Sequence, residues 1–233
     1  MDIKIAGFQK LTLLDYPGKV ACTAFTIGCN YRCPFCHNSA LVLPERFAVD
    51  IRHDHLFAFL KKRIGVLEGV CITGGEPTLH SGLRSFIQQV KDMGYAVKLD
   101  TNGSNPCLLT RLMEEGLLDY VAMDIKNTLA KYPQTVGISG LNVDSVVKST
   151  ELLLQKRIPF EFRTTLVREY HTPEDIREIG RWLQGAPRYI LQSFVDSGDL
   201  VGCEALHPLA EPQMRVMAHI LQPYMGNVEL RGV

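Results

Sequence analysis

The sequence predicts an α/β protein in which parallel strands form a partial (β/α)6 barrel. Six short runs rich in β-branched and aromatic residues recur along the chain, and each is followed by a stretch with the apolar spacing of a helix. Such alternation implies parallel strands joined by right-handed crossovers. A ligand site is then expected at the C-terminal ends of the strands. An open doubly wound sheet is the alternative.

The elements follow one another with ordinary loop lengths. The expected strands are residues 20–27, 69–73, 95–100, 120–125, 159–167 and 188–195, and the expected helices are residues 53–64, 83–93, 108–115, 143–156, 173–183 and 212–221. Asn105 and Thr172 each place a capping side chain before a proline, and Gly94, Gly116 and Gly185 follow helices. Residues 227–231 are expected to add one short strand at the edge of the barrel.

Length and composition favour one domain spanning residues 1–233. The chain has 233 residues, is 46% apolar, and carries a formal net charge of zero, so it lacks the broad basic field that drives binding to nucleic acid or to anionic membranes. No apolar run approaches the roughly 18 residues of a membrane span, and the first residues do not resemble a signal peptide. We therefore expect a cytoplasmic protein with no nucleic-acid or membrane partner.

Cysteines supply the strongest chemical signal. Cys29, Cys33 and Cys36 follow the first expected strand with the spacing C-x3-C-x2-C. Three thiolates can bind three irons of a four-iron cluster and leave the fourth iron open to a substrate. A zinc site that also uses His37 is disfavoured because side chains of adjacent residues diverge. A plain electron-transfer cluster remains an alternative.

Polar residues gather where later strands end. Gly74, Gly75 and Glu76 close the second strand, where the glycines allow a close backbone approach and the carboxylate offers an acceptor. Further along, Asp100 and Asn102 share a face of the third strand end, and Asp124 and Lys126 share a face of the fourth. Exposed turns and a surface ion pair are the alternative for these segments.

The cysteine segment, with Phe35 at its aromatic position, resembles the signature of the radical S-adenosylmethionine (SAM) superfamily. The resemblance implies one 4Fe-4S cluster whose open iron is chelated by the amino and carboxylate groups of SAM. By position, Phe35 and His37 would contact adenine. The segment Gly74-Gly75-Glu76-Pro77 resembles the family's GGEP motif, which binds the methionyl amine.

Other strand ends resemble the motifs of glycyl-radical-enzyme activating enzymes. Asp124 and Lys126 resemble the DxK motif, which implies that Lys126 approaches the cofactor carboxylate and Asp124 its ribose or a monovalent cation.

The remaining candidates follow from the same resemblance. Asp100 and Thr101 would complete the cation site, and Asn102 lies beside them. Arg163 resembles the family's arginine on the next strand. Gln192 stands in the region where activators of pyruvate formate-lyase carry a cofactor-binding histidine. His171 and His207 are interpreted as surface or capping residues.

The resemblance is closest to activators of anaerobic ribonucleoside-triphosphate reductase. It implies that the enzyme reductively cleaves SAM and that the 5′-deoxyadenosyl radical removes a hydrogen from a glycine Cα of the reductase. A flavodoxin- or ferredoxin-like donor is implied because the chain has no second cysteine cluster. Activation of pyruvate formate-lyase or of another glycyl radical enzyme is the alternative, and a non-catalytic iron–sulfur electron carrier is the alternative from another class. Residues 3–19 are expected to pack beneath the barrel, with docking of a partner as the alternative.

Overall fold

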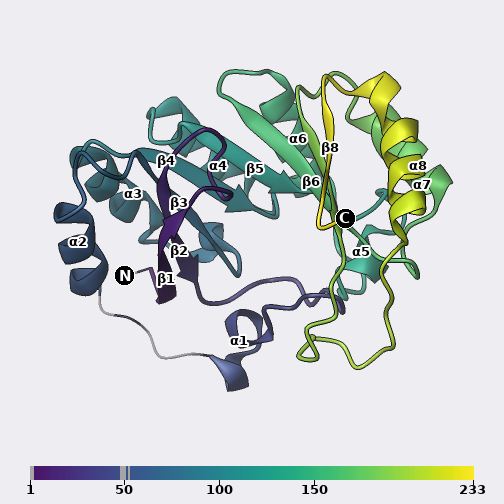
Figure 1. The fold of residues 1–233 in the computed structure, drawn as a ribbon, viewed down its shortest axis with the longest axis horizontal. Coiled ribbons are helices and arrows are strands. Elements are labelled where there is room, and N and C mark those ends of the chain that lie inside the picture. The colour runs from purple at the N-terminus through teal and green to yellow at the C-terminus, as the bar shows by residue number, and fades with distance from the viewer. Residues whose placement is uncertain (1–2, 48–50, 52) are drawn as a thin grey trace. The chain divides into compact units, whose positions relative to one another are not determined.

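The structure is a computed structural model that describes residues 3–47, 51 and 53–233. Its internal contacts divide the chain into two compact units, which are described separately below (Figure 1). The first unit comprises Met1–Asn30 and Ala40–Val121, and the second comprises Tyr31–Ser39 and Ala122–Val233. The single domain expected for residues 1–233 stays a prediction.

The first unit begins with an antiparallel pair of strands and continues with parallel ones. Strand β1 pairs antiparallel with β2, whereas the pairs β2–β3 and β3–β4 are parallel. The elements of this unit are β1 (Ile5–Thr12), β2 (Ala21–Thr26), α2 (His53–Lys61), β3 (Gly69–Gly74), α3 (Leu83–Asp92), β4 (Ala96–Thr101), α4 (Pro106–Glu114) and the start of β5 (Tyr120–Asp124), with 3-10 turns at Pro44–Arg46 and Pro77–Leu79. The short helix α1 (Ser39–Val42) begins in the second unit and ends in the first.

The second unit repeats the strand-and-helix alternation. The pairs β6–β7 and β7–β8 are parallel, and α8 packs beside α7 and against β8 (Figure 1). Its elements are the rest of β5, α5 (Tyr132–Thr135), α6 (Asp144–Leu154), β6 (Phe160–Leu166), α7 (Pro173–Trp182), β7 (Tyr189–Ser193), α8 (Glu211–Leu221), a 3-10 turn at Gln222–Tyr224 and β8 (Val228–Arg231).

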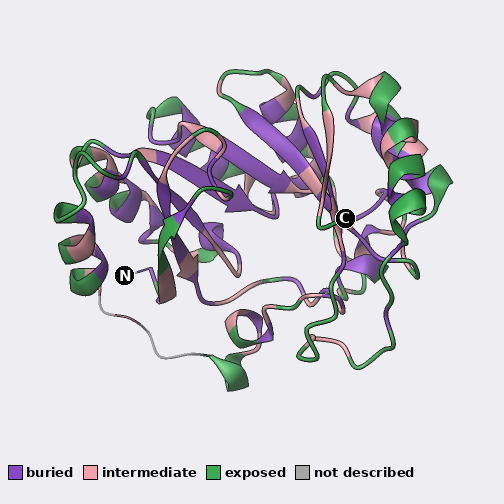
Figure 2. Cartoon of the chain, viewed as in Figure 1, coloured by how far each residue is buried: buried purple, intermediate pink, exposed green. Residues whose placement is uncertain are grey.

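The strands between the edge strands β1 and β8 form the buried layer of each unit, as Figure 2 shows in purple. Val70, Cys71 and Ile72 in the middle of β3 are fully buried. Helix α3 packs on this layer through an apolar face that includes the buried side chains of Phe86 and Ile87, while its polar face meets solvent. Burial of these apolar faces against the strands is the main force holding helices and sheet together.

Strand order confirms the predicted barrel-like progression. Neighbours in the sheet are neighbours in the chain, β1-β2-β3-β4-β5 in the first unit and β5-β6-β7-β8 in the second, so neither unit contains the order reversal of a doubly wound sheet. Among the described residues the sheet ends at β1 and β8 and is not closed. The six expected strands and six expected helices are present, with shifts of a few residues at their ends, and β8 confirms the short edge strand.

Residues 3–19, expected to pack beneath the barrel, form β1 and a following turn at the edge of the sheet. Ile3, Ile5 and Tyr16 are buried, whereas Leu11 is 54% exposed and Leu14 is 81% exposed, so the segment packs only in part. The alternative, docking of a partner, stays a prediction. None of the described helices has the length and apolar character of a membrane span.

Candidate functional site

The turn that ends β3 is built on two glycines. Gly74 has φ of +114°, a region that favours glycine, and a Cβ atom on Gly75 would lie 2.0 Å from the carbonyl oxygen of Gly28. The amide of Gly75 donates to the Thr26 carbonyl at 2.9 Å, and the amide of Glu76 donates to the Gly28 carbonyl at 2.7 Å. The double glycine therefore lets this turn lie against the end of β2, directly before Cys29.

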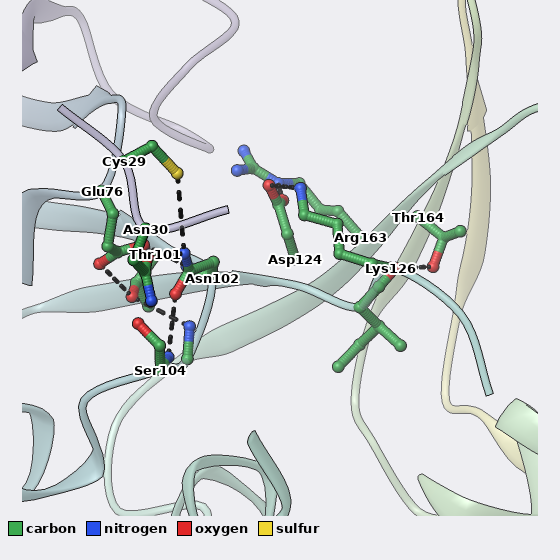
Figure 3. Close-up of polar contacts among 12 residues, drawn as sticks. Cys29, Asn30, Glu76, Thr101, Asn102, Ser104, Asp124, Lys126, Arg163 and Thr164 are labelled. Carbon is green, nitrogen blue, oxygen red and sulfur yellow. Dashed lines mark hydrogen bonds and ion pairs between the residues drawn. The ribbon is translucent and has the colours of Figure 1, made fainter. Parts of the chain in front are cut away.

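Glu76 is fully buried and joins the ends of β3 and β4. Its carboxylate accepts hydrogen bonds from the Thr78 amide at 3.1 Å and the Thr78 hydroxyl at 2.6 Å. It also accepts from the Thr101 hydroxyl at 2.8 Å and the Asn102 amide at 2.6 Å (Figure 3). Burial raises the pKa of this carboxyl, and the hydrogen bonds oppose the rise by stabilising its charged form. Glu76 thus fixes the strand ends around it through these four hydrogen bonds.

Asn102 connects the end of β4 to the first cysteine. Its side-chain amide donates to Asn30 Oδ1 at 2.9 Å and lies 4.0 Å from the Cys29 sulfur, while its own oxygen accepts from the amide of Ser104 at 2.9 Å (Figure 3). Amide donors near a thiolate stabilise its negative charge. The predicted candidates Cys29, Glu76, Thr101 and Asn102 therefore form one connected cluster in the first unit.

Asp100 lies in the same unit but has another partner. Its carboxylate forms a buried ion pair with Lys98, and the Cys71 sulfur lies 3.7 Å away. The Lys98 ammonium also lies 6.0 Å from the centre of the Tyr120 ring. Because Lys98 already balances the charge of Asp100, the structure does not support the monovalent cation expected near Asp100 and Asp124. Lys98 is a residue that the sequence interpretation missed.

In the second unit, one acidic and two basic side chains form a compact group (Figure 3). Asp124 lies 2.9 Å from the Lys126 ammonium and 3.0 Å from Nε of Arg163. Burial disfavours the charged form of Asp124, but the two cations outweigh it and hold its pKa well below the usual range. Burial likewise lowers the pKa of Lys126, but Asp124 and the nearby Cys33 and Cys36 outweigh that effect and raise it.

His171 contacts the backbone of this group at Lys126 and is buried, so its interpretation as a surface or capping residue is wrong. Its ring is buried, Nδ1 accepts from the Val167 amide at 3.1 Å, and Nε2 therefore donates to the Lys126 carbonyl at 2.9 Å. Burial lowers the pKa of His171, so the ring is neutral near pH 7. His207, by contrast, is exposed and pairs with Glu169, as expected of a surface residue.

Buried Asn127 is a further residue that the sequence did not reveal. Its side-chain amide donates to the Thr135 hydroxyl and to the Tyr170 carbonyl, both at 3.0 Å. These bonds fix the chain directly after Lys126. No sequence signal marks them, because one partner lies in α5 and the other in the loop that follows β6.

The second and third cysteines lie in the second unit, in a segment that we call the cysteine loop, residues 33–39. The amide of Cys36 donates to the Cys33 carbonyl at 3.0 Å, which makes a tight turn. The ring of Phe35 is buried, 5.9 Å from that of Tyr170, while His37 is exposed. Although its side chain reaches solvent, desolvation by the surrounding protein and the positive charge of Lys126 lower the pKa of His37.

Gln192 lies on β7, paired in register with Thr165 on β6 and with Arg231 on β8. Its predicted contact with the cofactor stays a prediction. Among the other cysteines, Cys22 and Cys71 are buried, and burial raises the pKa of the Cys22 thiol to about 12, while Cys107 and Cys203 are exposed. In the parts of the chain that the structure describes, no three His, Cys, Asp or Glu side chains are grouped as metal ligands.

Comparison with known proteins establishes the family. The model of the radical SAM superfamily matches residues 23–183. A Methanocaldococcus jannaschii protein named "Putative glycyl-radical enzyme activating enzyme" is 30% identical over 247 residues, covering 100% of this chain and 98% of that protein. The "Probable GTP 3',8-cyclase" of Thermococcus kodakarensis is 24% identical over 62% of this chain and 47% of that protein. The chain belongs to the radical SAM superfamily.

Solved structures show the same fold. A domain of pyruvate-formate lyase-activating enzyme from Bacteroides vulgatus matches with a TM-score of 0.58 and 17% identity, covering 71% of this chain and 99% of that one. SuiB from Streptococcus suis matches with a TM-score of 0.64 and 13% identity, covering 89% of this chain and 47% of that one. At these identities the likeness concerns the fold alone, and it agrees with the partial barrel.

Family membership implies a 4Fe-4S cluster and SAM, and the residues present fit both groups. Cys29, Cys33 and Cys36 offer three thiol donors, all outside disulfides, and thiolates are the ligands that iron–sulfur clusters take. Lys126 places a positive charge near Cys33 and Cys36, which suits an anionic cluster or a carboxylate. The chain is therefore a radical SAM enzyme.

Proposed function

We propose that this chain is a glycyl-radical-enzyme activating enzyme and that its partner is anaerobic ribonucleoside-triphosphate reductase. The similarity to a protein named as a glycyl-radical enzyme activating enzyme, over the whole chain, supports the activating role. The choice of the reductase as partner rests on the resemblance of the sequence motifs to activators of that enzyme. In the proposal, residues 1–233 work as one domain in the cytoplasm, and a flavodoxin- or ferredoxin-like protein supplies the electron.

Cys29, Cys33 and Cys36 would hold the cluster. When bound, the cluster and SAM supply a one-electron cleavage whose 5′-deoxyadenosyl radical takes a hydrogen atom from a glycine Cα of the partner. The residues of this chain bind, orient and shield these groups. Asn102, with its amide 4.0 Å from the sulfur of Cys29, would stabilise the charge of that ligand.

Cationic side chains of the second unit would bind the carboxylate of SAM. The raised pKa of Lys126 keeps its ammonium charged, and Asp124 holds Lys126 and Arg163 by hydrogen bonds of 2.9 and 3.0 Å. Asp124 is itself ionised, so it orients both cations and contributes a negative charge toward the ribose. Gln192 and Phe35 are proposed to complete the contacts, with Phe35 and His37 toward adenine.

On the first unit, Gly74, Gly75 and Glu76 would receive the methionyl ammonium. Because the oxygens of Glu76 already accept hydrogen bonds from Thr101 and Asn102, Glu76 would act mainly by positioning these two residues. We do not include a monovalent cation, since the Lys98 ammonium already forms an ion pair with the Asp100 carboxylate.

The partner can be tested directly. Reconstituted enzyme, SAM and a reductant are incubated without oxygen with anaerobic ribonucleotide reductase, and in parallel with pyruvate formate-lyase, and electron paramagnetic resonance detects a glycyl radical. A radical on the reductase alone supports the proposal. A radical on pyruvate formate-lyase alone supports the alternative activator, and SAM cleavage with no radical on either protein contradicts the proposed partner.

A further inference from the structure

Residues 199–204, which follow β7, lie along the cysteine loop of the same unit. The amide of Val201 donates to the Cys36 carbonyl at 3.1 Å, and the amide of Gly202 donates to the Pro34 carbonyl at 2.9 Å. Two backbone hydrogen bonds therefore join residues 199–204 to the turn that carries Cys33 and Cys36. We call residues 199–204 the strap.

Side chains at both ends of the strap strengthen this pairing. Asp199 accepts a hydrogen bond of 2.7 Å from the hydroxyl of Ser39, which is buried at the end of the cysteine loop. Glu204 accepts one of 3.0 Å from the hydroxyl of Tyr170, whose ring packs against Phe35. Burial and Glu204 raise the pKa of Tyr170 to about 12, so its hydroxyl remains a donor.

Gly202 allows the strap to approach this closely. A Cβ atom at this position would lie 2.7 Å from the Pro34 Cβ and 2.9 Å from the Pro34 Cα. Contacts this short force a displacement, and the nearest atoms belong to a rigid proline ring and to backbone. Any side chain at Gly202 must therefore separate the strap from the cysteine loop.

We propose that the strap positions the cysteine loop for cluster binding and that Asp199 and Gly202 are its positioning residues. The inference rests on the proposed role of Cys33 and Cys36 as cluster ligands. The strap contacts neither SAM nor a partner in this proposal. It restrains the cysteine loop, so that Cys33 and Cys36 keep their positions and the cluster dissociates slowly.

The first test uses the reconstituted full-length enzyme. After a ferrous-iron chelator is added without oxygen, the visible absorbance of the cluster is followed with time. Loss of the charge-assisted hydrogen bond in Asp199→Ala should speed cluster loss about tenfold, and Gly202→Ala should have at least that effect. The double variant Asp199→Ala with Ser39→Ala should lose the cluster no faster than Asp199→Ala alone, because the two substitutions remove the same hydrogen bond.

Matched controls carry the same substitutions elsewhere. Asp196→Ala removes a carboxylate that accepts from the Gly198 amide within its own turn. Gly7→Ala adds a methyl group whose nearest neighbour is a side-chain carbon 4.0 Å away. Both controls should keep the wild-type rate. Wild-type rates in Asp199→Ala and Gly202→Ala would overturn the proposal.

A second measurement needs neither SAM nor a partner. The full-length protein without cluster is treated with iodoacetamide, and mass spectrometry gives the alkylation rate of each cysteine. The strap variants should expose Cys33 and Cys36 to faster alkylation while Cys107 keeps its rate. Faster alkylation of Cys33 and Cys36 in the strap variants, together with a wild-type enzyme that activates no glycyl radical enzyme, would support the role of the strap and refute only the proposed function. Unchanged alkylation in the strap variants would refute the role of the strap.

Discussion

Gly75→Ala is a sensitive test of how the glycine turn is built. In the structure an added methyl carbon would lie 2.0 Å from the Gly28 oxygen and 2.6 Å from the Gly28 carbonyl carbon. An ordinary contact needs about 3.4 Å or more, so the turn must move by more than about 1 Å. That movement strains the hydrogen bonds from Gly75 to Thr26 and from Glu76 to Gly28.

The expected magnitude combines two effects. Overpacking of a tight site costs about 1–3 kcal/mol, and weakening of two backbone hydrogen bonds adds about 1–2 kcal/mol. A total near 3 kcal/mol lowers the Tm of a chain of this size by roughly 6–12 °C. Because Gly28 precedes Cys29, the same variant should also retain less iron after reconstitution.

The assay is thermal unfolding followed by circular dichroism, with Gly7→Ala as the control. Gly7→Ala should unfold within about 2 °C of wild type, because the added carbon finds room. If Gly75→Ala has the same Tm as the control and binds as much iron, the double glycine is not needed for the turn to pack against the end of β2. Its role would then lie with the ligand, as the motif alone suggested.

Three other perturbations test the polar groups. The pKa of His171 is lowered in the folded protein, so its contribution to stability is full above about pH 6.5 and is lost as the pH falls through the folded value. In denaturant titrations, the free energy of unfolding should fall by at most about 1.4 kcal/mol per pH unit in that range. His171→Gln should remove this pH dependence. Lys98→Met should cost about 3–5 kcal/mol in urea unfolding because Asp100 loses its partner, whereas Lys98→Met with Asp100→Leu should recover most of that loss. Lys126→Met should weaken SAM binding in calorimetry by about ten- to hundredfold, while Lys131→Met, as a control, should not, and equal affinities would contradict the proposed carboxylate contact.

Much of the fold was predictable because local patterns and tertiary structure agree. Helix α7 shows this agreement: Thr172 and Asp175 form a capping box and Pro173 follows the cap, so the sequence marks its start. Strand β1 was not among the expected strands, because it forms through its antiparallel pairing with β2. Long-range pairing of this kind leaves no local signal.

The candidate site was predictable where a motif carries the chemistry. Asp124 at the end of β5, Lys126 two residues further on and Arg163 of β6 lie together, as their positions at the ends of neighbouring strands predicted. Lys98 looked like an ordinary strand residue, and His171 like a loop residue. Their roles depend on burial and on partners far along the chain, which the sequence does not display.

The central claim is that Cys29, Cys33 and Cys36 support reductive cleavage of SAM. The most direct measurement is 5′-deoxyadenosine formation by anaerobically reconstituted protein with SAM and dithionite, beside a Cys33→Ala control. We predict reductant-dependent product from the wild type and none from the control. Product formation that survives Cys33→Ala, or its absence in a wild-type protein with a full cluster and bound SAM, would contradict the claim.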